Sequence, residues 1–384
     1  MKILAVSMAS AHFFNWISQL EGTHHEIYWL DVYDSGNKVK KIDFVHQFVG
    51  WRYKWDFPAR HLLKGNFPKV YSVISRFNEV KLEKMMDSVI EQVQPDIVHS
   101  FNFQSAAIPL ISVMKRRQLK WICSSWGSDI FYYSSIKSEL KLLDSLCSII
   151  DYLFTDCNRE YKQSLKHGFK GKFLGVFPGR GGFLTQELRQ EINFNKRKDH
   201  KTIIVKGNHG VFGRSHTVLK ALSLIKSKIC DWKIIVFGCS EVTLNYIQTL
   251  FNRKEIDVYG QISHQLIIKL MGNAAIYIGN SISDGMPNTL YEAIIMDVFP
   301  IQSNPGGATS EIIRHNFNGL LIENPNDTKS ISELILKATG SSKLINNAII
   351  FNRENIIPSI ERNFIREKVI NRYNSIELDL GISN

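Results

Sequence analysis

Short apolar runs alternate with amphipathic stretches along the first half of the chain. Lys2–Met8, Ile27–Val32 and Asp96–Ser100 are runs of the kind that form strands buried on both faces of a parallel sheet. Val70–Gln94 and Ser105–Arg117 repeat apolar residues at helical spacing, so we expect each to form a helix. This alternation of strands and helices predicts a doubly wound α/β domain.

The pattern stops at Pro178–Gly182 and starts again with a strand at Thr202–Lys206. The stretch between them is polar and rich in charge, includes Lys196–Lys198, and holds little that could join a core. We therefore expect a second α/β domain after a linker. The expected division is 1–183 for the first domain, 184–201 for the linker, 202–355 for the second domain and 356–384 for a C-terminal helical segment.

The segment Ile276–Glu311 concentrates the candidate chemistry. An apolar strand, Ile276–Gly279, leads through a polar loop to a helix that we expect to start at Pro287. Proline suits the first helical position because its missing N–H is one that the first turn leaves unpaired. The amides of Asn288 and Thr289, together with the positive end of the helix dipole, would favour an anion such as a diphosphate.

Two acids flank this turn. Glu292 lies one helical turn beyond Asn288 and could accept hydrogen bonds from a vicinal diol such as a ribose. Asp284 precedes Gly285 and could reach hydroxyls on the group that follows the diphosphate. A capping residue and a solvated helix face would give the same spacing, so the spacing alone does not decide between that interpretation and nucleotide-sugar binding.

This segment resembles the signature of the family 4 retaining glycosyltransferases. The family carries two glutamates separated by seven residues, and Asp284 and Glu292 keep that spacing with Gly285 and Pro287 between them. A Gly-Gly pair ahead of Glu311 also fits the family. The resemblance implies the GT-B fold, in which two Rossmann-like domains face a cleft and a C-terminal helix crosses back to the first. It also implies that the first acid contacts the donor sugar and the second the ribose.

A second loop carries positive charge. Three glycines, the first Gly207 and the last Gly213, lie between a strand and a helix, and such residues let the backbone approach a ligand closely. Lys206 and Arg214 flank the loop. The family places an arginine and a lysine here to stabilise the departing diphosphate, so the resemblance implies this role for Arg214 and Lys206.

The resemblance also implies contacts around these groups. The residues expected to bind the donor are Gly207, Gly213, Tyr259, Gln261, Gly285, Met286, Pro287, Asn288 and Thr289. On the acceptor side the family often has a histidine, a glycine, a small residue and an aspartate. Trp126 replaces that histidine, which excludes a step depending on its imidazole, while Asp129 remains and His12 is a titratable group in the first loop.

The implied chemistry needs no metal or cofactor beyond the nucleotide-diphosphate sugar itself. No side chain stands out as a covalent nucleophile. The resemblance implies attack on the same face of the sugar, with a phosphate oxygen of the donor taking the acceptor proton. No CxxC pair or HExxH element occurs, so we expect no structural zinc.

The net charge of +11 and the pI near 9.3 predict an anionic partner, which could be nucleic acid, an acidic membrane or a phosphorylated substrate. One segment mixes aromatic residues with basic ones. These are Phe44, Phe48, Trp51, Tyr53, Trp55, Phe57, Phe67 and Tyr71, with Lys41, Arg52, Lys54, Arg60, Lys64 and Lys69. The mixture fits an interfacial membrane patch, a surface that stacks single-stranded nucleic acid, or core aromatics beside a solvated basic face.

Five scattered cysteines are typical of reduced thiols in a cytoplasm. The start of the chain resembles a weak signal peptide, but a first strand accounts for the same residues. No apolar run approaches the ~18 residues that a membrane span requires. We expect a cytoplasmic protein, with peripheral contact to the inner face of the membrane as an open alternative.

The sequence thus predicts a retaining glycosyltransferase that moves a sugar to the hydroxyl of a saccharide or lipid-linked acceptor, in bacterial surface polysaccharide or glycoconjugate assembly. Two alternatives stay open. A nucleic-acid-binding protein would show steeply salt-dependent affinity for polynucleotides and would give Glu292 no task. A hydrolase or epimerase of nucleotide sugars with the same fold would act without an acceptor.

Overall fold

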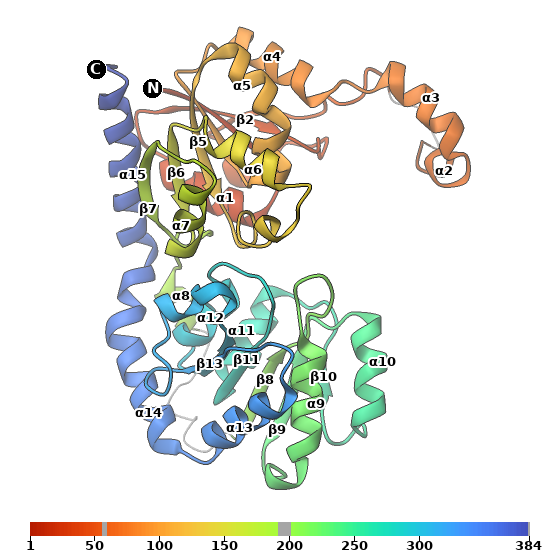
Figure 1. Cartoon of the computed structure of the whole chain (residues 1–384), viewed down its shortest axis with the longest axis vertical. Coiled ribbons are helices and arrows are strands. Elements are labelled where there is room, and N and C mark those ends of the chain that lie inside the picture. Colours follow the sequence, from red (N-terminus) through yellow and green to blue (C-terminus); the bar gives the residue numbers. More distant parts are fainter. Residues whose placement is uncertain (56–59, 191–200, 383–384) are drawn as a thin grey trace. The chain divides into compact units, whose positions relative to one another are not determined.

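A computed structural model describes residues 1–55, 60–190 and 201–382 of the chain. The chain forms two compact units (Figure 1). The first contains residues 1–155, 160–176 and 368–384, and the second contains residues 156–159 and 177–367. The last residues of the chain therefore belong to the same unit as the first ones.

The described part of the first unit holds a seven-stranded sheet in which all neighbours are parallel, in the order β3-β2-β1-β4-β5-β6-β7. Its strands are β1 Lys2–Ser7, β2 Glu26–Asp31, β3 His46–Phe48, β4 Ile97–Phe101, β5 Lys120–Ser125, β6 Tyr152–Thr155 and β7 Lys172–Val176. The helices are α1 Ala11–Ile17, α2 Arg60–Asn66, α3 Pro68–Asn78, α4 Leu82–Val93, α5 Ile111–Arg117, α6 Leu140–Cys147 and α7 Asn158–Lys166. This is the doubly wound arrangement that the sequence predicts.

The two faces of this sheet differ in composition. Aliphatic side chains of β1 and β4, such as Leu4 and Val98, pack against α4, α5 and α6 in one core cluster. The other face is aromatic, with the ring of Phe13 5.2 Å from that of Trp29 and the ring of Trp16 5.2 Å from that of Phe154. Alternation along each strand produces both faces, since successive side chains point to opposite sides.

The last helix, α15 (Arg362–Asp379), completes the aromatic face. Tyr373 is fully buried, and its hydroxyl accepts a hydrogen bond from Trp16 Nε1 (3.2 Å) and bonds to His99 Nδ1 (2.8 Å). Both partners belong to the first unit. The predicted return of the C-terminal helix to the first Rossmann-like unit is therefore confirmed.

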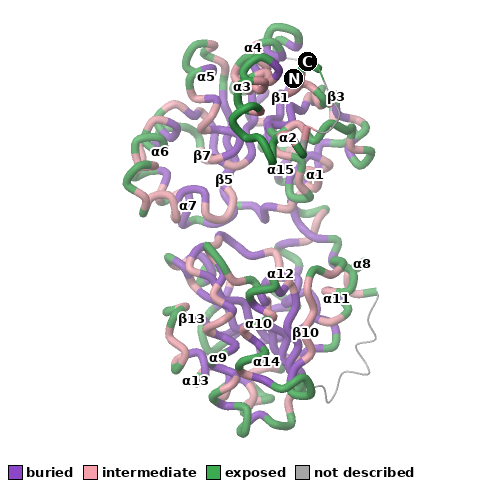
Figure 2. The backbone as a smooth tube through the Cα atoms, turned by 90° about the vertical axis from the view of Figure 1, so that its right-hand side faces the viewer, coloured by how far each residue is buried: buried purple, intermediate pink, exposed green. Residues whose placement is uncertain are grey.

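The second unit repeats the topology. Its described residues form a six-stranded parallel sheet in the order β10-β9-β8-β11-β12-β13. The strands are β8 Thr202–Lys206, β9 Lys233–Phe237, β10 Asp257–Val258, β11 Ile276–Gly279, β12 Phe299–Ser303 and β13 Leu320–Ile322. The helices are α8 Thr185–Gln190, α9 Ser215–Ile225, α10 Glu241–Leu250, α11 His264–Gly272, α12 Asn288–Ile295, α13 Thr328–Thr339 and α14 Ser342–Phe351. Figure 2 shows that the strands of each unit are largely buried.

The prediction of one helix over Val70–Gln94 is wrong. Helix α3 ends at Asn78, and α4 starts at Leu82. Between them, the backbone of Glu79 pairs with that of Tyr53, and Val80 N donates to Arg52 O (2.8 Å). The break comes from pairing with a segment that is distant in sequence, which the local apolar pattern does not record.

One further boundary differs from prediction. Helix α12 starts at Asn288, one residue later than predicted, and Pro287 is its N-cap. After the Gly-Gly pair the chain forms only a short 3₁₀ turn, Thr309–Glu311. It cannot continue as an α-helix because the side chain of Asn318 accepts the N–H of Arg314 (2.6 Å).

Part of the predicted linker is structured. Residues 185–190 form α8, where Arg189 bonds to both carboxylate oxygens of Asp297 at 2.9 and 2.8 Å. Residues 191–200, which include the Lys196–Lys198 run, lie outside the described residues. None of the described helices combines the length and apolar character that a membrane-spanning helix requires.

Candidate functional site

Two loops of the second unit meet at the carboxyl ends of its strands. The Gly-rich loop after β8 (207–214) bonds to the loop after β11 (280–287) through Arg214 N to Asn280 O (2.9 Å) and Ile282 N to Phe212 O (2.9 Å). Strands β8 and β11 are parallel neighbours, so their carboxyl ends share one edge of the sheet. Ligands of doubly wound sheets bind at this edge, which we call the donor edge.

The glycines of the first loop are required by close packing of the protein itself. A side chain at Gly207 would place its Cβ 2.6 Å from Cys239 Sγ and 2.9 Å from Phe237 O. One at Gly213 would lie 2.3 Å from Asn208 O. The sequence pattern therefore identified tight positions, but their crowding comes from neighbouring backbone and the Cys239 thiol.

The two predicted cations differ in their surroundings. Arg214 donates from Nη1 to the carbonyls of Gly210 and Gly213, both at 2.8 Å, and so holds its own loop. Lys206 ends β8 and is half-buried. Its ammonium makes no ion pair or hydrogen bond with any residue in the described ranges. Lys206 is thus the more available partner for an anion at this edge.

A stack of rings supports the same loop. The ring of His209 lies 3.5 Å from that of His216, which lies 4.1 Å from that of Tyr246. Burial, followed by the neighbouring His209, lowers the pKa of His216 to about 4; burial, followed by Arg214, lowers the pKa of His209. Because folding disfavours their protonation, the stability that they contribute is present above pH 6.5 and is lost as the pH falls toward 4.

Both predicted acids lie around one buried phenol. Tyr277 is fully buried on β11, and its hydroxyl donates to Thr289 Oγ1 at 2.8 Å. Its pKa is raised above the usual range, first by burial and then by the charges of Asp284 and Glu292. The strand, the loop and the first turn of α12 thus bring the two carboxylates to the same part of the donor edge.

Glu292 is buried, with 3% of its surface exposed, and one of its two carboxylate oxygens accepts hydrogen bonds from the described residues. Oε1 accepts hydrogen bonds from Arg180 Nη1 and His264 Nε2, both at 2.7 Å. Oε2 accepts none from the part of the chain that the structure describes. A buried carboxylate with one open oxygen is suited to accept a hydroxyl of a ligand.

Sequence reasoning missed Arg180 and His264. Arg180 lies in the Pro178–Gly182 stretch, where we expected the first α/β pattern to stop and predicted no site residue. His264 is the first residue of α11 and lies three residues after Gln261, which we predicted to bind the donor. The position of Arg180 between two glycines could have marked it as a candidate site residue. No pattern in the sequence marked His264.

Asp284 is half-buried, and none of the described residues hydrogen-bonds its carboxylate. The next two residues are fixed by Asp156, a buried residue that sequence reasoning also missed. A side chain at Gly285 would place its Cβ 2.1 Å from Asp156 Oδ2, and Met286 N donates to the same oxygen at 3.4 Å. The loop is therefore held on one side by Asp156, with Asp284 left available.

The start of α12 and the turn after β10 complete the predicted donor contacts. Pro287 is the N-cap of α12 and makes no side-chain capping hydrogen bond, and Asn288 and Thr289 form the first turn of the helix. The turn is tied to the end of β9 by Cys239 N to Tyr259 O at 3.2 Å, and Gln261 beside it is exposed. All the predicted donor residues thus belong to loops and ends at the donor edge.

The three residues predicted for the acceptor side lie in the first unit. The ring of His12, which is exposed, is 5.8 Å from that of Trp126. Asp129 is buried and accepts hydrogen bonds from Trp126 N (2.9 Å), Phe103 N (3.0 Å) and Asn102 Nδ2 (2.6 Å). Its carboxylate therefore shapes the loop that presents Trp126.

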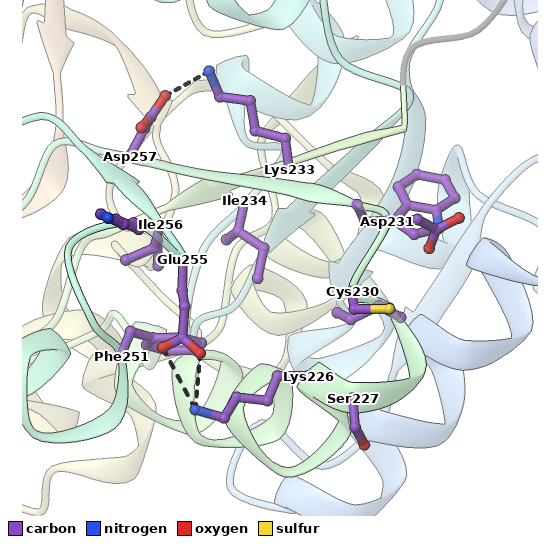
Figure 3. Close-up of a pocket in the computed structure, with 13 residues that line it drawn as sticks. Lys226, Ser227, Cys230, Asp231, Lys233, Ile234, Phe251, Glu255, Ile256 and Asp257 are labelled. Atoms are coloured by element: carbon purple, nitrogen blue, oxygen red, sulfur yellow. Dashed lines mark hydrogen bonds and ion pairs between the residues drawn. The ribbon is translucent and has the colours of Figure 1, made fainter.

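A cavity of about 750 Å³ lies at the opposite edge of the second sheet (Figure 3). It includes Lys233 and Asp257, the first residues of β9 and β10, which pair at 2.6 Å, and Lys226, which pairs with Glu255 at 3.1 Å. None of the predicted site residues lines it. The predicted site residues of this unit therefore lie away from this cavity.

Solved structures resemble the chain over nearly its whole length. A glycosyltransferase from Rickettsia africae has a TM-score of 0.70 at 16% identity, covering 98% of each chain. Anabaena HepE in complex with UDP-glucose has a TM-score of 0.68 at 13% identity, covering 98% of this chain and 100% of that one. The lipopolysaccharide outer core galactosyltransferase WaaB has a TM-score of 0.67 at 14% identity, covering 98% and 99%. At these identities, the matches show the fold.

Family profiles identify the chain more closely. The profile "Glycosyl transferase 4-like" matches residues 2–157, and "Glycosyl transferases group 1" matches residues 187–354. No curated protein sequence matches significantly. With both Rossmann-like units covered by these profiles, the chain belongs to the group 1 glycosyl transferases and is a nucleotide-sugar-dependent glycosyltransferase of the GT-B fold.

Proposed function

We propose that the protein transfers a sugar from a nucleotide-diphosphate sugar to an acceptor hydroxyl with retention of anomeric configuration. The observation that carries this proposal is the buried Glu292 carboxylate, one turn down α12 from its start, whose Oε2 accepts no hydrogen bond from the described residues. A diphosphate at that helix start places the ribose of the same nucleotide next to Glu292. Asp284, whose carboxylate has no hydrogen bond within the described ranges, then meets hydroxyls of the sugar.

The chemical step breaks the bond between the anomeric carbon and the diphosphate oxygen and forms a bond from the same carbon to the acceptor oxygen. Negative charge grows on the departing diphosphate, and preorganised cations stabilise it in the transition state. Lys206, whose ammonium has no partner among the described residues, supplies positive charge, and Arg214 keeps the loop in place through two carbonyls. A phosphate oxygen of the leaving group takes the acceptor proton, so protons and charge balance without a protein base.

We propose a uridine diphosphate sugar as the donor, because HepE, which shares the fold, was solved with UDP-glucose. The test is a thermal-shift screen of nucleoside diphosphates and their sugars. A ligand that binds only the folded state raises its apparent stability, by about 2.7 kcal/mol at one hundred times its Kd. We expect UDP and a UDP-sugar to raise Tm.

Two results would contradict this assignment. Polynucleotide binding with steep salt dependence and no shift by any nucleotide sugar would favour a nucleic-acid-binding protein. Release of free sugar at the same rate with and without acceptors would favour a hydrolase. A donor-dependent, acceptor-dependent product with the anomeric configuration of the donor supports the transferase.

We further propose that the acceptor is met at an anionic membrane, as in assembly of a bacterial surface glycoconjugate on the inner face. The support is α3, where Val70, Val73 and Phe77 recur at helical spacing and are 51%, 57% and 67% exposed. Residues 60–78 contain four Lys or Arg residues and no Asp or Glu. Helices α2 and α3 extend away from the sheet of their unit (Figure 1). A row of apolar side chains with basic residues beside it can bind the surface of a membrane that contains anionic lipid.

This interpretation covers only part of the aromatic-basic segment. Phe48 and Trp51 pack against the core of the first unit, whereas Trp55 and Phe67 are exposed. Phe57 lies outside the described residues. The segment therefore divides into core aromatics and an exposed helical arm.

We expect the protein to float with vesicles that contain anionic lipid at low salt, and to lose binding at high salt because screening weakens the electrostatic part. The double change Val73→Asp with Phe77→Asp should abolish flotation. Leu224→Asp, at a position 64% exposed on α9, is the matched control and should leave it unchanged. Equal flotation of all three proteins, or none by the wild type, would contradict membrane contact at α3.

A further inference from the structure

A compact group of candidate metal ligands lies in the first unit, apart from the donor edge. Ligand atoms of His24, His25 and Glu377 all lie within 4.8 Å of one another. His24 Nε2 is 2.6 Å from Glu377 Oε2, and His25 Nδ1 is 3.9 Å from Glu377 Oε1. The two histidines directly precede β2, while Glu377 lies on α15, one turn beyond Tyr373.

The buried member of the group lacks hydrogen bonds. The side chain of His25 is fully buried, and neither of its ring nitrogens has a hydrogen-bond partner among the residues that the structure describes. Leaving a buried polar atom unsatisfied costs about 1–3 kcal/mol. A ring placed like this, beside a carboxylate, needs a reason beyond packing.

The ring of His25 is oriented toward the acid. Its Nδ1 lies 3.9 Å from Glu377 Oε1, a separation too long for a hydrogen bond. Metal ions bind imidazole through a ring nitrogen, and an ion between these two atoms would bind to both.

We infer that His24, His25 and Glu377 form a binding site for a divalent transition metal ion of the zinc class, with water completing the coordination. Two ligand atoms that share a four-coordinate zinc at 2.0–2.1 Å lie about 3.3 Å from each other. The observed 2.6 and 3.9 Å bracket this spacing, and His24, which is 44% exposed, is free to adjust. Two imidazoles and one carboxylate are ligands that zinc takes in proteins.

Nearby groups fit this assignment. A histidine that gives Nδ1 to a metal carries its proton on Nε2, and metal-bound histidines donate that N–H to an oxygen. Asn374 lies three residues before Glu377 on α15, and its Oδ1 is a buried oxygen that has no hydrogen-bond partner among the described residues. In the structure, the Met1 ammonium group donates a hydrogen bond to Glu377 Oε1 (2.7 Å). A metal ion bound to that oxygen would replace the ammonium group there.

The site would join the segment before β2 to the C-terminal helix. Tyr373 and Glu377 are four residues apart and share one face of α15, so metal binding adds a second attachment beside the Tyr373 hydrogen bonds. Anything that binds only the folded chain stabilises it. The proposal is independent of the donor edge and of the transferase assignment.

The test uses the full chain without a histidine tag, stripped with EDTA and titrated with ZnCl₂ and, separately, CoCl₂. We expect one ion per chain, a rise in Tm, and the strong visible absorption of Co²⁺ in a low-symmetry site with nitrogen ligands. His24→Gln should weaken Zn²⁺ binding at least tenfold and remove the rise in Tm, while Tm in EDTA stays at the wild-type value. Glu377→Gln should lose binding as well.

His46→Gln is the matched control, because His46 is exposed in the same unit and also faces an acid, with Nε2 3.9 Å from Glu26 Oε1. It should bind Zn²⁺ like the wild type. Equal Zn²⁺ affinity in the wild type and His24→Gln, or no one-to-one binding in the wild type, would overturn the assignment.

Discussion

Glu292→Gln is expected to lower kcat/KM for sugar transfer about a hundredfold, mostly through a higher KM for the donor. The carboxylate accepts hydrogen bonds from Arg180 and His264 on one oxygen, and we propose that the other oxygen binds the ribose. Hydrogen bonds to a charged group are worth roughly 1.5–3 kcal/mol each, and about 2.7 kcal/mol corresponds to a hundredfold change. Because the ribose is bound in ground state and transition state alike, its loss appears in KM.

The measurement is steady-state kinetics, with a thermal-shift titration of the nucleoside diphosphate. A nucleoside diphosphate contains the ribose but not the transferred sugar. If it no longer raises the Tm of Glu292→Gln, the change affects binding of the nucleotide. Unchanged nucleotide affinity would remove Glu292 from the site and with it the proposed orientation of the donor.

Asp297→Asn is the matched control. Asp297 is buried to a similar degree, 7% against 3% exposed, and follows α12 in the chain. It pairs with Arg189 and Arg353, both at 2.8 Å, and these contacts hold down its pKa against the opposing effect of burial. We expect this change to lower Tm and to leave the donor KM unchanged, which separates loss of a buried charge from loss of a ligand contact.

The local part of the donor edge could be predicted because it is continuous in sequence. Strand, loop and helix from Ile276 to Ile295 follow one another, and a parallel strand delivers its carboxyl end to the edge where ligands bind. The same rule brought Lys206 to that edge, since β8 pairs with β11. The apolar strand pattern and the proline before the helix were sufficient to predict this order of strand, loop and helix.

The contacts of Glu292 could not be predicted, because its partners come from elsewhere in the chain. Arg180 is 112 residues away and His264 is 28 residues away, and no spacing rule connects them. The candidate metal ligands are a stronger case, since His24 and Glu377 are 353 residues apart. A search for short ligand motifs does not detect such a group, and we expected no zinc for that reason.

The helix break at Glu79 shows the same limit on a local scale. Its apolar spacing fits a helix, but Arg52 pairs with its carboxylate at 3.2 Å and Tyr53 pairs with its backbone. Tertiary contacts outweigh helix propensity, which is worth less than about 1 kcal/mol per residue.

Lys206→Ala is expected to lower kcat about a hundredfold with little change in donor KM. Its ammonium is half-buried at the donor edge and unpaired within the described ranges, so its charge is available for the departing diphosphate. Removing one preorganised group that stabilises transition-state charge typically costs about 10²–10³ in kcat. Arg214→Ala should instead raise KM and lower Tm, because Arg214 holds Gly210 and Gly213.

Lys226→Ala is the control for loss of one positive charge. Lys226 lies at the other edge of the same sheet, beside the cavity of Figure 3, where it pairs with Glu255. An exposed pair of this kind contributes about 0–1 kcal/mol, so kcat should stay at the wild-type value. The measurement is kcat of the three variants at saturating donor, which identifies the cation that stabilises the leaving group. If Arg214→Ala lowers kcat and Lys206→Ala does not, that cation is the Arg214 guanidinium. The carbonyl contacts of Arg214 must then break when the donor binds.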